Sequence, residues 1–274
     1  MPLTPEALRS RLAGQSWTSH NIRLTPEIST MPGEPDFIET DLRLHAIVRV
    51  LRFLHGDRFD GLRIADLGCL EGGFALGLAQ LGAHVVGVEA RSINIEKTRL
   101  LQEHFGLDRL EFVCADVKDF SVATFGMFDV VLALGILYHL DQPSAWLEQI
   151  AEATKRILVV DTHYAPSQDE GLGKLDANLP LGPIETVRHA RHTYEGRWFH
   201  EYGEEIDPED QLWASYSNNR SFWLTKESLL MSIRNSGFDL VFEQHDYSAP
   251  FYRRFTTSFP RVMIVAAKSQ PASA

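Results

Sequence analysis

The ten residues ADLGCLEGGF, at positions 65–74, decide how this chain is expected to fold. The short apolar run LRIADLG leads into them, and the helix-forming run GFALGLAQLG overlaps their end. A strand that ends in a glycine turn and passes into a helix is the frame of a nucleotide-binding loop. The glycines follow the spacing G-x-x-x-G-G, and Leu70 stands where a dinucleotide-binding loop has its second glycine. Leu70 and Glu71 make the loop poorly suited to a pyrophosphate, which disfavours an NAD-dependent oxidoreductase.

Beyond this loop, apolar runs and helical patterns alternate along residues 62–163. The strand-like runs are AHVVGVEA, LEFVCADV, the start of MFDVVLALGILYHL, and KRILVVDTHY, with helical patterns between them. After the helical pattern TKESLLMSIRNSGF come two further strand-like runs, DLVFEQHDY and RVMIVAAK. Near-continuous apolar strands that alternate with helices are typical of a parallel sheet covered on both faces. The pattern therefore predicts an α/β, Rossmann-like, doubly wound and mostly parallel sheet.

The flanking segments predict additions to this core. TPEALRSRLAG predicts a short helix with Thr4 as N-cap, an irregular segment follows to residue 35, and residues 36–55 predict an amphipathic helix. We expect an N-terminal helical cap over residues 1–58 and a main domain over 59–274. Residues 164–222, rich in Gly, Pro, His and aromatic residues, are too long for a plain loop and predict a lid insertion. Thr225 and Gly237 predict the ends of the helix that follows.

Composition narrows the class of protein. The chain has 274 residues, 44% of them hydrophobic, and a net charge of −11. This negative charge favours solubility and opposes nonspecific binding to nucleic acid or anionic lipid. No apolar run approaches the roughly 20 residues that span a bilayer, and the first residues lack a signal-peptide pattern. The two cysteines, Cys69 and Cys114, predict reduced, buried thiols rather than a disulfide. We expect a cytoplasmic protein with no membrane partner.

Two acidic residues indicate the ligand. Glu89 ends the second strand about 20 residues after Gly68, where an acidic side chain accepts hydrogen bonds from ribose hydroxyls. Asp116 follows the third strand and is placed to accept from an adenine amino group. The loop itself suits an amino acid head group. A ligand with a ribose, an adenine and an amino acid head but no phosphate is S-adenosylmethionine.

At these positions the chain resembles the class I S-adenosylmethionine-dependent methyltransferases. IADLGCLEGGF, VVGVEAR, FVCADVKDF and FDVVLALGILYHL match the first four motifs of that family in order and spacing. The resemblance implies seven strands, with the last one antiparallel. It implies contacts to the methionine moiety, the ribose, the adenine and the methyl group of the cofactor, and a further contact from the N-terminal segment of the protein. The residues implied for these contacts are, in chain order, Trp17, Asp66, Gly68, Cys69, Gly72, Glu89, Ala90, Asp116, Val117 and Leu134.

A looser resemblance extends outside this core. SWTSHNIRL, GILYHLDQP and NNRSFWLTKESLLMSIRNSGFDLV resemble the subgroup of tRNA wobble-uridine carboxymethyltransferases and their relatives of unassigned substrate. In that subgroup the N-terminal segment closes over the cofactor, which implies a flap that contains Trp17 and His20. The acidic balance departs from a tRNA enzyme, whereas the basic cluster at 187–200 with Arg253 and Arg254 fits one.

Candidate catalytic residues follow the fourth and fifth strands. His139, Asp161 and His163 are expected at the carboxyl edge of the sheet, where open α/β folds bind ligands. Either histidine is a candidate general base, and the alternative for all three is a structural role in packing or a turn. Candidate acceptor contacts, with core packing or a solvated loop as the alternative, are His20, Tyr138, Arg191, Arg197, Trp198, Trp213 and Tyr216.

The sequence thus predicts a methyltransferase that moves a methyl group from S-adenosylmethionine to an O or N atom of a small-molecule acceptor by in-line displacement. Two alternatives stay open: a tRNA-modifying methyl or carboxymethyl transferase, and a non-catalytic S-adenosylmethionine-binding protein. The eleven histidines show no zinc-site spacing, so no metal is expected. A divalent cation that assists transfer to vicinal hydroxyls is the alternative.

Overall fold

The computed structural model describes residues 2–167, 181–202, 206–207, 211–245 and 260–269. The chain divides into two compact units, Met1–Val117 and Lys118–Ala274. The helical cap expected over residues 1–58 lies within the first unit, and its standing as a separate domain stays a prediction.

The first unit begins with the elements that precede the loop. Helix α1 (Pro5–Ala13) is capped by Thr4, whose Oγ1 accepts from the amide of Ala7, as predicted. The segment expected to be irregular contains a small hairpin of β1 (Arg23–Thr25) and β2 (Ile28–Ser29). The helix expected over residues 36–55 is shorter than predicted. A 3₁₀ turn, η1 (Ile38–Thr40), comes first, and α2 (Leu42–His55) begins only where Asp41 caps the amide of Arg43.

The rest of the first unit is three parallel strands with their connecting helices. The strands β3 (Arg63–Leu67), β4 (His84–Glu89) and β5 (Leu110–Cys114) pair in that order. Helices α3 (Gly73–Gln80) and α4 (Ser92–Phe105) connect them. Short βαβ connections bring the carboxyl ends of all three strands to one edge, and this edge presents the loop.

The second unit continues the alternation. After η2 (Val117–Asp119) and α5 (Val122–Phe125), β6 (Phe128–Leu134) leads through η3 (Leu137–His139) and α6 (Pro143–Ala153) to β7 (Thr154–His163), which is parallel to β6. Thr225 caps α7 (Lys226–Asn235), as predicted. The strands β11 (Leu240–Gln244) and β12 (Arg261–Ala267) close the unit, and β12 is antiparallel to both β11 and β7.

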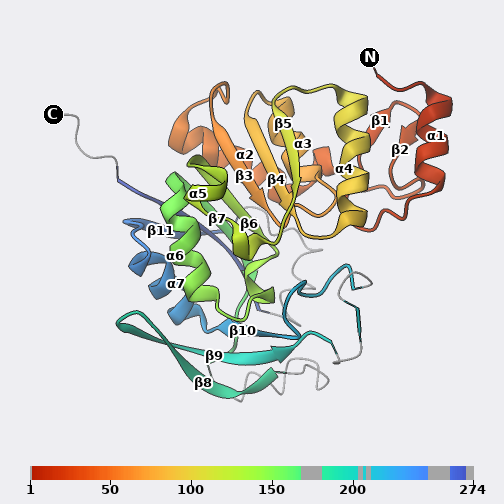
Figure 1. Cartoon of the computed structure of the whole chain (residues 1–274). Helices are drawn as coiled ribbons and strands as arrows, with labels where there is room; N and C mark the ends of the chain where they lie inside the picture. The colour runs from red at the N-terminus through yellow and green to blue at the C-terminus, as the bar shows by residue number, and fades with distance from the viewer. Residues whose placement is uncertain (1, 168–180, 203–205, 208–210, 246–259, 270–274) are drawn as a thin grey trace. The chain divides into compact units, whose positions relative to one another are not determined.

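The strand order of the main sheet is β11-β12-β7-β6-β3-β4-β5. Within the first unit, Figure 1 shows β3, β4 and β5 side by side. A mostly parallel sheet of seven strands whose last strand in the chain is antiparallel confirms the predicted fold class. Its central strands are buried on both faces, with Val130, Val131 and Leu132 at 0% exposure, which explains their unbroken apolar sequence.

The segment expected to form a lid contributes two strands to a separate three-stranded sheet, and the third strand begins within it. Within residues 164–222, β8 (Leu181–His189) and β9 (His192–His200) form a long antiparallel hairpin, and β10 (Arg220–Leu224) pairs with β9 (Figure 1). A lid function for this segment stays a prediction. Arg253 and Arg254, the other basic residues considered for tRNA, lie outside the described residues.

The two cysteines differ in burial. Both are free thiols, and Cys69 is buried in the loop as expected, but Cys114 is exposed. The prediction of a second buried thiol was therefore wrong. Cys114 is the last residue of β5, which is the terminal strand of the sheet and is covered by a neighbouring strand on one side only.

Candidate active site

The loop after β3 has a backbone that its glycines make possible. Gly68 and Gly72 adopt the left-handed φ values of +70° and +78°. Leu70, at the place of the missing second glycine, also has a left-handed φ of +51°. This conformation costs a non-glycine residue about 1–2 kcal/mol. The amide of Leu70 donates to Oε2 of Glu89 at 3.1 Å, so the acidic residue at the end of β4 holds the strained turn in place.

Glu89 is itself fixed from two sides. Its Oε2 accepts from Leu70, and its Oε1 accepts from the amide of Arg91 at 2.9 Å. The residue is only 5% exposed, and burial raises the pKa of the carboxyl although Arg91 opposes this effect. Each carboxylate oxygen has a second acceptor direction. A fixed carboxylate at this place is suited to accept from two neighbouring hydroxyls of a ribose.

Asp66 offers a second acceptor at the end of β3. It is 2% exposed, and within the described parts of the chain its Oδ2 is buried without a hydrogen-bond partner. Burial raises the pKa of Asp66 to about 7, although the amide of Ala75 donates to it and lowers the pKa in part. Leaving a buried polar atom unpaired costs about 1–3 kcal/mol. An ammonium or hydroxyl donor on a ligand would satisfy it, so Asp66 and Glu89 fit S-adenosylmethionine and repel a phosphate.

Packing as well as ligand approach accounts for the glycines. A Cβ on Gly72 would lie 2.6 Å from the ring of Phe112, and a Cβ on Gly87 would lie 2.6 Å from the same ring. Cys69 belongs to this layer, since its Sγ would be 2.9 Å from a Cβ on Gly87. Burial raises the pKa of the Cys69 thiol well above its usual value, which removes it as a nucleophile.

The other cofactor candidates follow strand ends. Ala90 is half-buried after β4, and its carbonyl accepts from Sγ of Cys114 at 3.4 Å. After β5, Asp116 is half-buried and Val117 is 5% exposed. Leu134, at the end of β6 in the second unit, is half-buried and pairs in register with a residue of β7. Among these, the first unit gathers Ala90, Asp116 and Val117 at the carboxyl edge of its own strands.

Glu71 fastens the N-terminal segment to the loop. It is fully buried, forms an ion pair with Lys97 at 2.8 Å, and accepts from the backbone amides of Thr18, Ser19 and His20 at 2.7–3.0 Å. Burial acts to raise the pKa of Glu71, but the amide of His20 and the Lys97 ammonium hold it below its usual value. The carboxylate that disfavours a pyrophosphate therefore serves the fold rather than a ligand.

Trp17 and His20 lie against this loop. Trp17 is 8% exposed, and the Lys97 ammonium is 5.9 Å from its ring. Nδ1 of His20 accepts from the amide of Gly73, the first residue of α3, at 3.0 Å. Burial lowers the pKa of His20 to about 4, so it is neutral at neutral pH. This placement suits a flap that is fixed to the loop, while contact with an acceptor stays a prediction for His20.

In the second unit, His139 meets a carboxylate that sequence reasoning missed. Nδ1 of His139 is 3.0 Å from both Oε1 and Oε2 of Glu201, whose side chain is 2% exposed. Glu201 also accepts from Oγ of Ser221 at 2.7 Å and from the amide of Ser215 at 3.2 Å. Nδ2 of Asn218 donates to the carbonyl of His139 at 2.9 Å. A histidine with Nδ1 fixed by a buried carboxylate keeps Nε2 as its acceptor.

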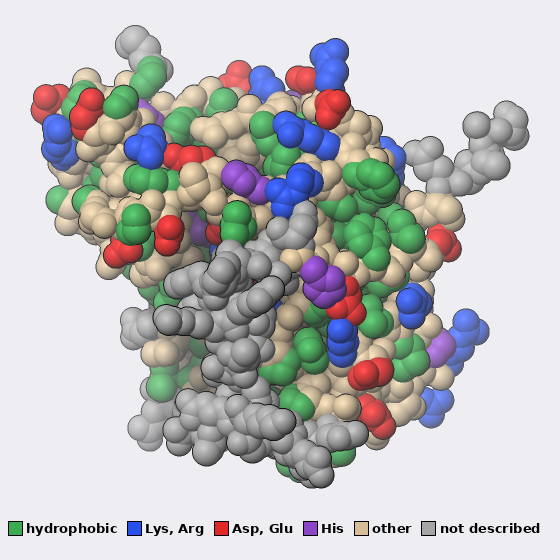
Figure 2. Space-filling model, turned by 180° about the vertical axis from the view of Figure 1, so that it is seen from behind, with side chains coloured by type: hydrophobic (Ala, Val, Ile, Leu, Met, Phe, Trp, Pro, Cys, Tyr) green, Lys and Arg blue, Asp and Glu red, His purple; other side chains and the backbone are tan. Residues whose placement is uncertain are grey.

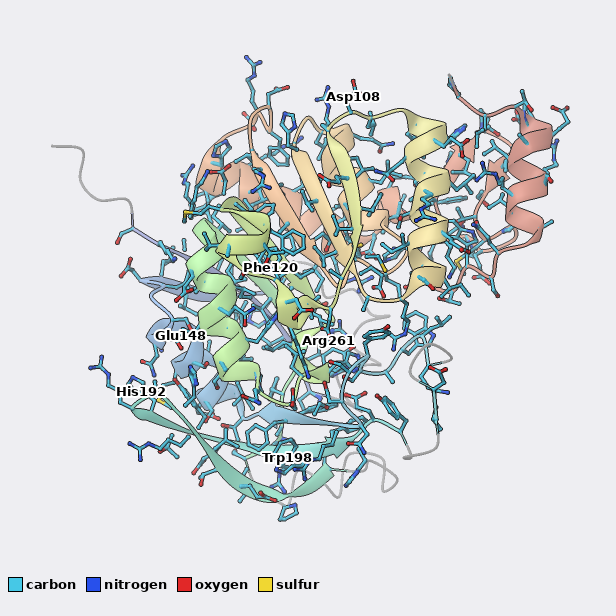
Figure 3. The ribbon with its side chains drawn as sticks, viewed as in Figure 1. Asp108, Phe120, Glu148, His192, Trp198 and Arg261 are labelled. Carbon is cyan, nitrogen blue, oxygen red and sulfur yellow. The ribbon has the colours of Figure 1, made fainter. Side chains whose placement is uncertain are left out.

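Asp161 and His163, the other two catalytic candidates, share a partner on β12. Arg261 donates to both oxygens of Asp161, at 2.9 and 2.8 Å, in a two-pronged ion pair. Figure 3 labels Arg261 within this cluster of side chains. Nε2 of His163 is 3.4 Å from the same guanidinium, and its Nδ1 is 3.2 Å from the carbonyl of Pro260. Burial and the Arg261 charge lower the pKa of His163 to about 4.

An aromatic cluster joins these groups. The centroid of the Tyr138 ring lies 4.2 Å from that of His139 and 4.6 Å from that of His163. The Trp223 ring stacks on His163, with 5.2 Å between centroids, and on Phe199, with 4.8 Å between centroids. Burial raises the pKa of Tyr138. The second unit thus brings four predicted residues, Tyr138, His139, Asp161 and His163, into one cluster.

The remaining acceptor candidates are not gathered there. Arg197 is 1% exposed and donates to the carbonyls of Pro166 and Gly182, which gives it a role in the fold. Arg191 is exposed at the β8–β9 turn, and Trp213 is 59% exposed. Two further residues are half-buried, Tyr216 and Trp198, and Figure 3 labels Trp198. Trp198 packs on Phe222 and carries Arg220 over its ring.

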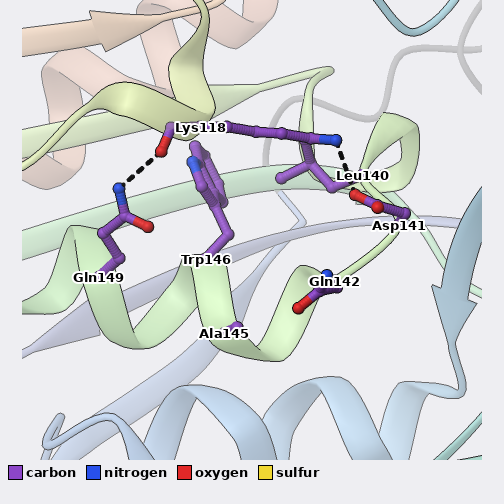
Figure 4. A pocket seen from close by; sticks show the side chains of 7 residues that line it. All are labelled: Lys118, Leu140, Asp141, Gln142, Ala145, Trp146 and Gln149. Atoms are coloured by element: carbon purple, nitrogen blue, oxygen red, sulfur yellow. Dashed lines mark hydrogen bonds and ion pairs between the residues drawn. The ribbon is translucent and has the colours of Figure 1, made fainter. Parts of the chain in front are cut away.

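A small cavity of about 190 Å³ lies beside α6 in the second unit. Figure 4 shows its walls, which include Trp146 and an ion pair between Lys118 and Asp141 at 2.7 Å. Nε2 of Gln149 donates to the carbonyl of Lys118 at 2.9 Å.

Among the residues that the structure describes, no three His, Cys, Asp or Glu side chains are grouped to hold a metal ion. In the same part of the chain, no helix is long and apolar enough to cross a membrane.

Comparison with known proteins identifies relatives. A family model described as "Methyltransferase domain" matches residues 58–218. A ubiquinone biosynthesis O-methyltransferase from Maricaulis maris (strain MCS10) is 35% identical over 51% of this chain and 56% of its own length. The mitochondrial enzyme of the same name from Schizosaccharomyces pombe is 34% identical over 35% of each chain. The chain thus spans about half, or less, of the curated relatives that it matches.

Solved structures agree on the fold. The N-terminal domain of EvdMO1, solved with SAH bound, has a TM-score of 0.71 at 24% identity and covers 98% of both chains. The magnesium protoporphyrin IX methyltransferase ChlM from Synechocystis PCC 6803 has a TM-score of 0.52 at 19% identity, over 87% of this chain and 90% of that one. The resemblance to the tRNA subgroup finds no support in these relatives. The chain belongs to the methyltransferase domain family, and its fold is that of the class I S-adenosylmethionine-dependent methyltransferases.

Proposed function

We propose that this protein transfers a methyl group from S-adenosylmethionine to a hydroxyl oxygen of a small-molecule acceptor. The observation that carries the proposal is the His139–Glu201 pair, in which a buried carboxylate holds Nδ1 at 3.0 Å. A hydroxyl acceptor needs such a base, because it must lose its proton as the new bond to carbon forms. The curated relatives that match part of the chain are named O-methyltransferases, which agrees with this choice.

In this proposal the first unit holds the cofactor. Asp66 takes the ammonium of the methionine moiety, and Glu89 takes the ribose hydroxyls. The backbone of the loop at Gly68 and Cys69 lies against the methionine moiety, and Asp116 with Val117 receives the adenine. When bound, S-adenosylmethionine supplies an activated methyl group on a sulfonium. The protein then has to orient the acceptor, and alignment of reacting groups is worth about 7–11 kcal/mol in favourable cases.

His139 is the proposed general base. With its Nδ1 proton donated to Glu201, Nε2 is the acceptor for the hydroxyl proton. The imidazolium that forms is stabilised by the Glu201 carboxylate, and Ser221 and the amide of Ser215 keep that carboxylate in place. Such a base contributes typically about 10²–10⁴-fold to the rate.

His163 suits this role less well than His139. Its low pKa, about 4, makes it a weak base, and both ring nitrogens face partners, Pro260 and Arg261. We assign His163, Asp161 and Arg261 to the wall of the acceptor site. The half-buried or exposed aromatic residues Trp198, Trp213 and Tyr216 are the proposed lid contacts.

The two alternatives have weaker support. A tRNA acceptor calls for a broad basic surface, whereas the net charge is −11 and, on the face shown in Figure 2, the Lys and Arg side chains are scattered among Asp and Glu. A non-catalytic binding protein would have no use for a base held by a buried carboxylate. A cytoplasmic location and a small-molecule partner are part of this proposal.

The test is a product assay with a panel of phenols, sugars, aliphatic alcohols and amines, in which release of S-adenosylhomocysteine reports turnover. We expect at least one hydroxyl compound to be methylated and His139→Gln to lower kcat by about 10²-fold or more, with unchanged cofactor affinity. His192→Gln, a histidine of β9, is the matched control. Turnover of amines alone, or full activity in His139→Gln, would contradict the proposal.

A further inference from the structure

A second cavity lies in the first unit, apart from the loop that the proposed function uses. It has a volume of about 500 Å³, within the range of small-molecule sites. Residues of α2 and α3 line it, together with residues at β1 and η1. Its lining residues on α2 are Leu44, His45, Val48 and Arg52, and those on α3 and its end are Leu76, Gly77, Gln80 and Leu81.

The floor of this cavity is apolar. Leu44 and Leu76 are 5% and 2% exposed, and Ile22 and Ile38 add further buried side chains to the lining. A Cβ on Gly77 would lie 2.8 Å from a methyl of Leu44, so the two helices approach closely. Val48 is half-buried and Leu81 is 42% exposed. Most of the side chains that the cavity offers to a ligand are therefore aliphatic.

Its charged groups lie at opposite ends. At the end near His45, Arg23 pairs with Glu39 at 2.9 Å, and Nε2 of His45 contacts the Glu39 carbonyl, so these charges are already compensated. Arg52 stands eight positions after Leu44 on the same helix, about 12 Å further along its axis. Arg52 is exposed, and over the described residues its side chain has no ion pair or hydrogen bond, although its carbonyl accepts from the amide of Gly56. Gln80 lines the same cavity.

The helix that supplies Arg52 differs in charge from the rest of the chain. Helix α2, LRLHAIVRVLRFLH, carries three arginines and no acidic residue, whereas the whole chain has a net charge of −11. An apolar trough with an uncompensated cation at one end complements a molecule with an apolar tail and an anionic head. The compensated Arg23–Glu39 pair at the other end offers no such attraction.

We propose that this cavity binds a single-chain amphiphile with an anionic head, such as a medium-chain fatty carboxylate. The tail lies over Leu44, Val48 and Leu76, and the head group pairs with Arg52. The site is distinct from the proposed cofactor and base residues, so its occupancy and methyl transfer are tested separately.

The experiment is calorimetry on the full chain with sodium dodecanoate below its critical micelle concentration. Val48→Trp fills the trough, Arg52→Gln removes the head-group charge, and Arg49→Gln on the same helix but outside the lining is the matched control. Dodecyltrimethylammonium, with the same tail and opposite charge, and vesicles that contain anionic lipid are the comparison ligands. S-adenosylhomocysteine binding to each variant reports whether the first unit is intact.

We expect one dodecanoate per chain, binding abolished in Val48→Trp, about fivefold weaker in Arg52→Gln and unchanged in Arg49→Gln. The cationic amphiphile should bind at least fivefold more weakly than dodecanoate. Equal binding of both amphiphiles, dodecanoate binding unaffected by Val48→Trp and Arg52→Gln, or binding to vesicles alone would overturn the proposal. If Val48→Trp fails to bind S-adenosylhomocysteine, the comparison of Arg52→Gln with Arg49→Gln decides.

Discussion

Nδ1 of His139 and the carboxylate of Glu201 meet at 3.0 Å although 62 positions separate them in the chain. We predict that Glu201→Gln lowers kcat by about tenfold or more, because the amide no longer stabilises a positive imidazolium. Steady-state kinetics at saturating cofactor measure this effect.

Glu195→Gln is the matched control, because Glu195 is an exposed glutamate on β9. It should leave kcat unchanged. Full kcat in Glu201→Gln, or an equal loss of kcat in Glu195→Gln, would contradict the role proposed for Glu201.

The buried pair of Glu71 and Lys97 predicts a large loss of stability when one partner is removed. Lys97→Met leaves the fully buried Glu71 carboxylate with backbone donors but no cation, and should cost about 3–5 kcal/mol in the free energy of unfolding. The double variant Glu71→Gln with Lys97→Met should lose less than Lys97→Met alone. Urea titration gives these values.

Lys155→Met serves as the comparison for that series. Lys155 pairs with Asp129 at 3.3 Å, but its side chain is 46% exposed, so its loss should cost about 0–1 kcal/mol. Similar losses of stability in Lys97→Met and Lys155→Met would contradict the stabilising role given to the buried Glu71–Lys97 pair.

The raised pKa of Asp66 predicts that the free energy of unfolding depends on pH. Its pKa in the fold, about 7, is above the usual 3.8, so the folded state favours the protonated carboxyl. Stability is therefore retained below about pH 4 and is lost as pH rises to about 7, by about 4 kcal/mol in total. Asp66→Asn stays neutral, and without cofactor its Tm should exceed that of the wild type increasingly from pH 5 to pH 8. The same variant should lose cofactor affinity. A Tm difference that is constant with pH would contradict the assignment.

The packing of Phe112 against Gly87 predicts that position 87 tolerates no side chain. In Gly87→Ala the new Cβ would lie 2.6 Å from the Phe112 ring, so the ring has to shift. The substitution should lower the free energy of unfolding by about 1–3 kcal/mol. Adding Phe112→Leu should recover part of this loss, whereas Gly14→Ala, whose Cβ meets only a carbonyl at 3.9 Å, should cost little. Thermal unfolding of the four proteins tests this, and no recovery in the double variant would count against it.

Local patterns predicted most of the fold. The unbroken apolar strands, the caps at Thr4 and Thr225 and the loop after β3 depend on neighbours in the chain, and these predictions were confirmed. The two errors have different causes. Asp41 is a local cap that starts α2 later than apolar periodicity suggested. Cys114 is exposed because β5 is the terminal strand of the sheet, and strand order is not visible in local patterns.

Contacts between residues far apart in the sequence could not be predicted from it. Glu201 stands in an acidic run that resembles a solvated loop, and only the folded second unit brings it to His139. Arg261 pairs with Asp161 across 100 positions, through the antiparallel register of β12 and β7. Glu71 looked like a feature of ligand choice, but its partners Thr18 and Lys97 come from segments on either side of the loop. Single-sequence patterns contain no signal for such pairs.

The most direct measurement is calorimetric binding of S-adenosylhomocysteine to the wild type, Glu89→Gln and Glu111→Gln, with NAD as the comparison ligand. Glu111 lies exposed on β5, in register with the strand that carries Glu89, and is the matched control. We predict binding of one S-adenosylhomocysteine per wild-type chain, affinity at least tenfold weaker in Glu89→Gln, no change in Glu111→Gln, and no binding of NAD. Tight NAD binding, or S-adenosylhomocysteine affinity that survives Glu89→Gln intact, would contradict this prediction.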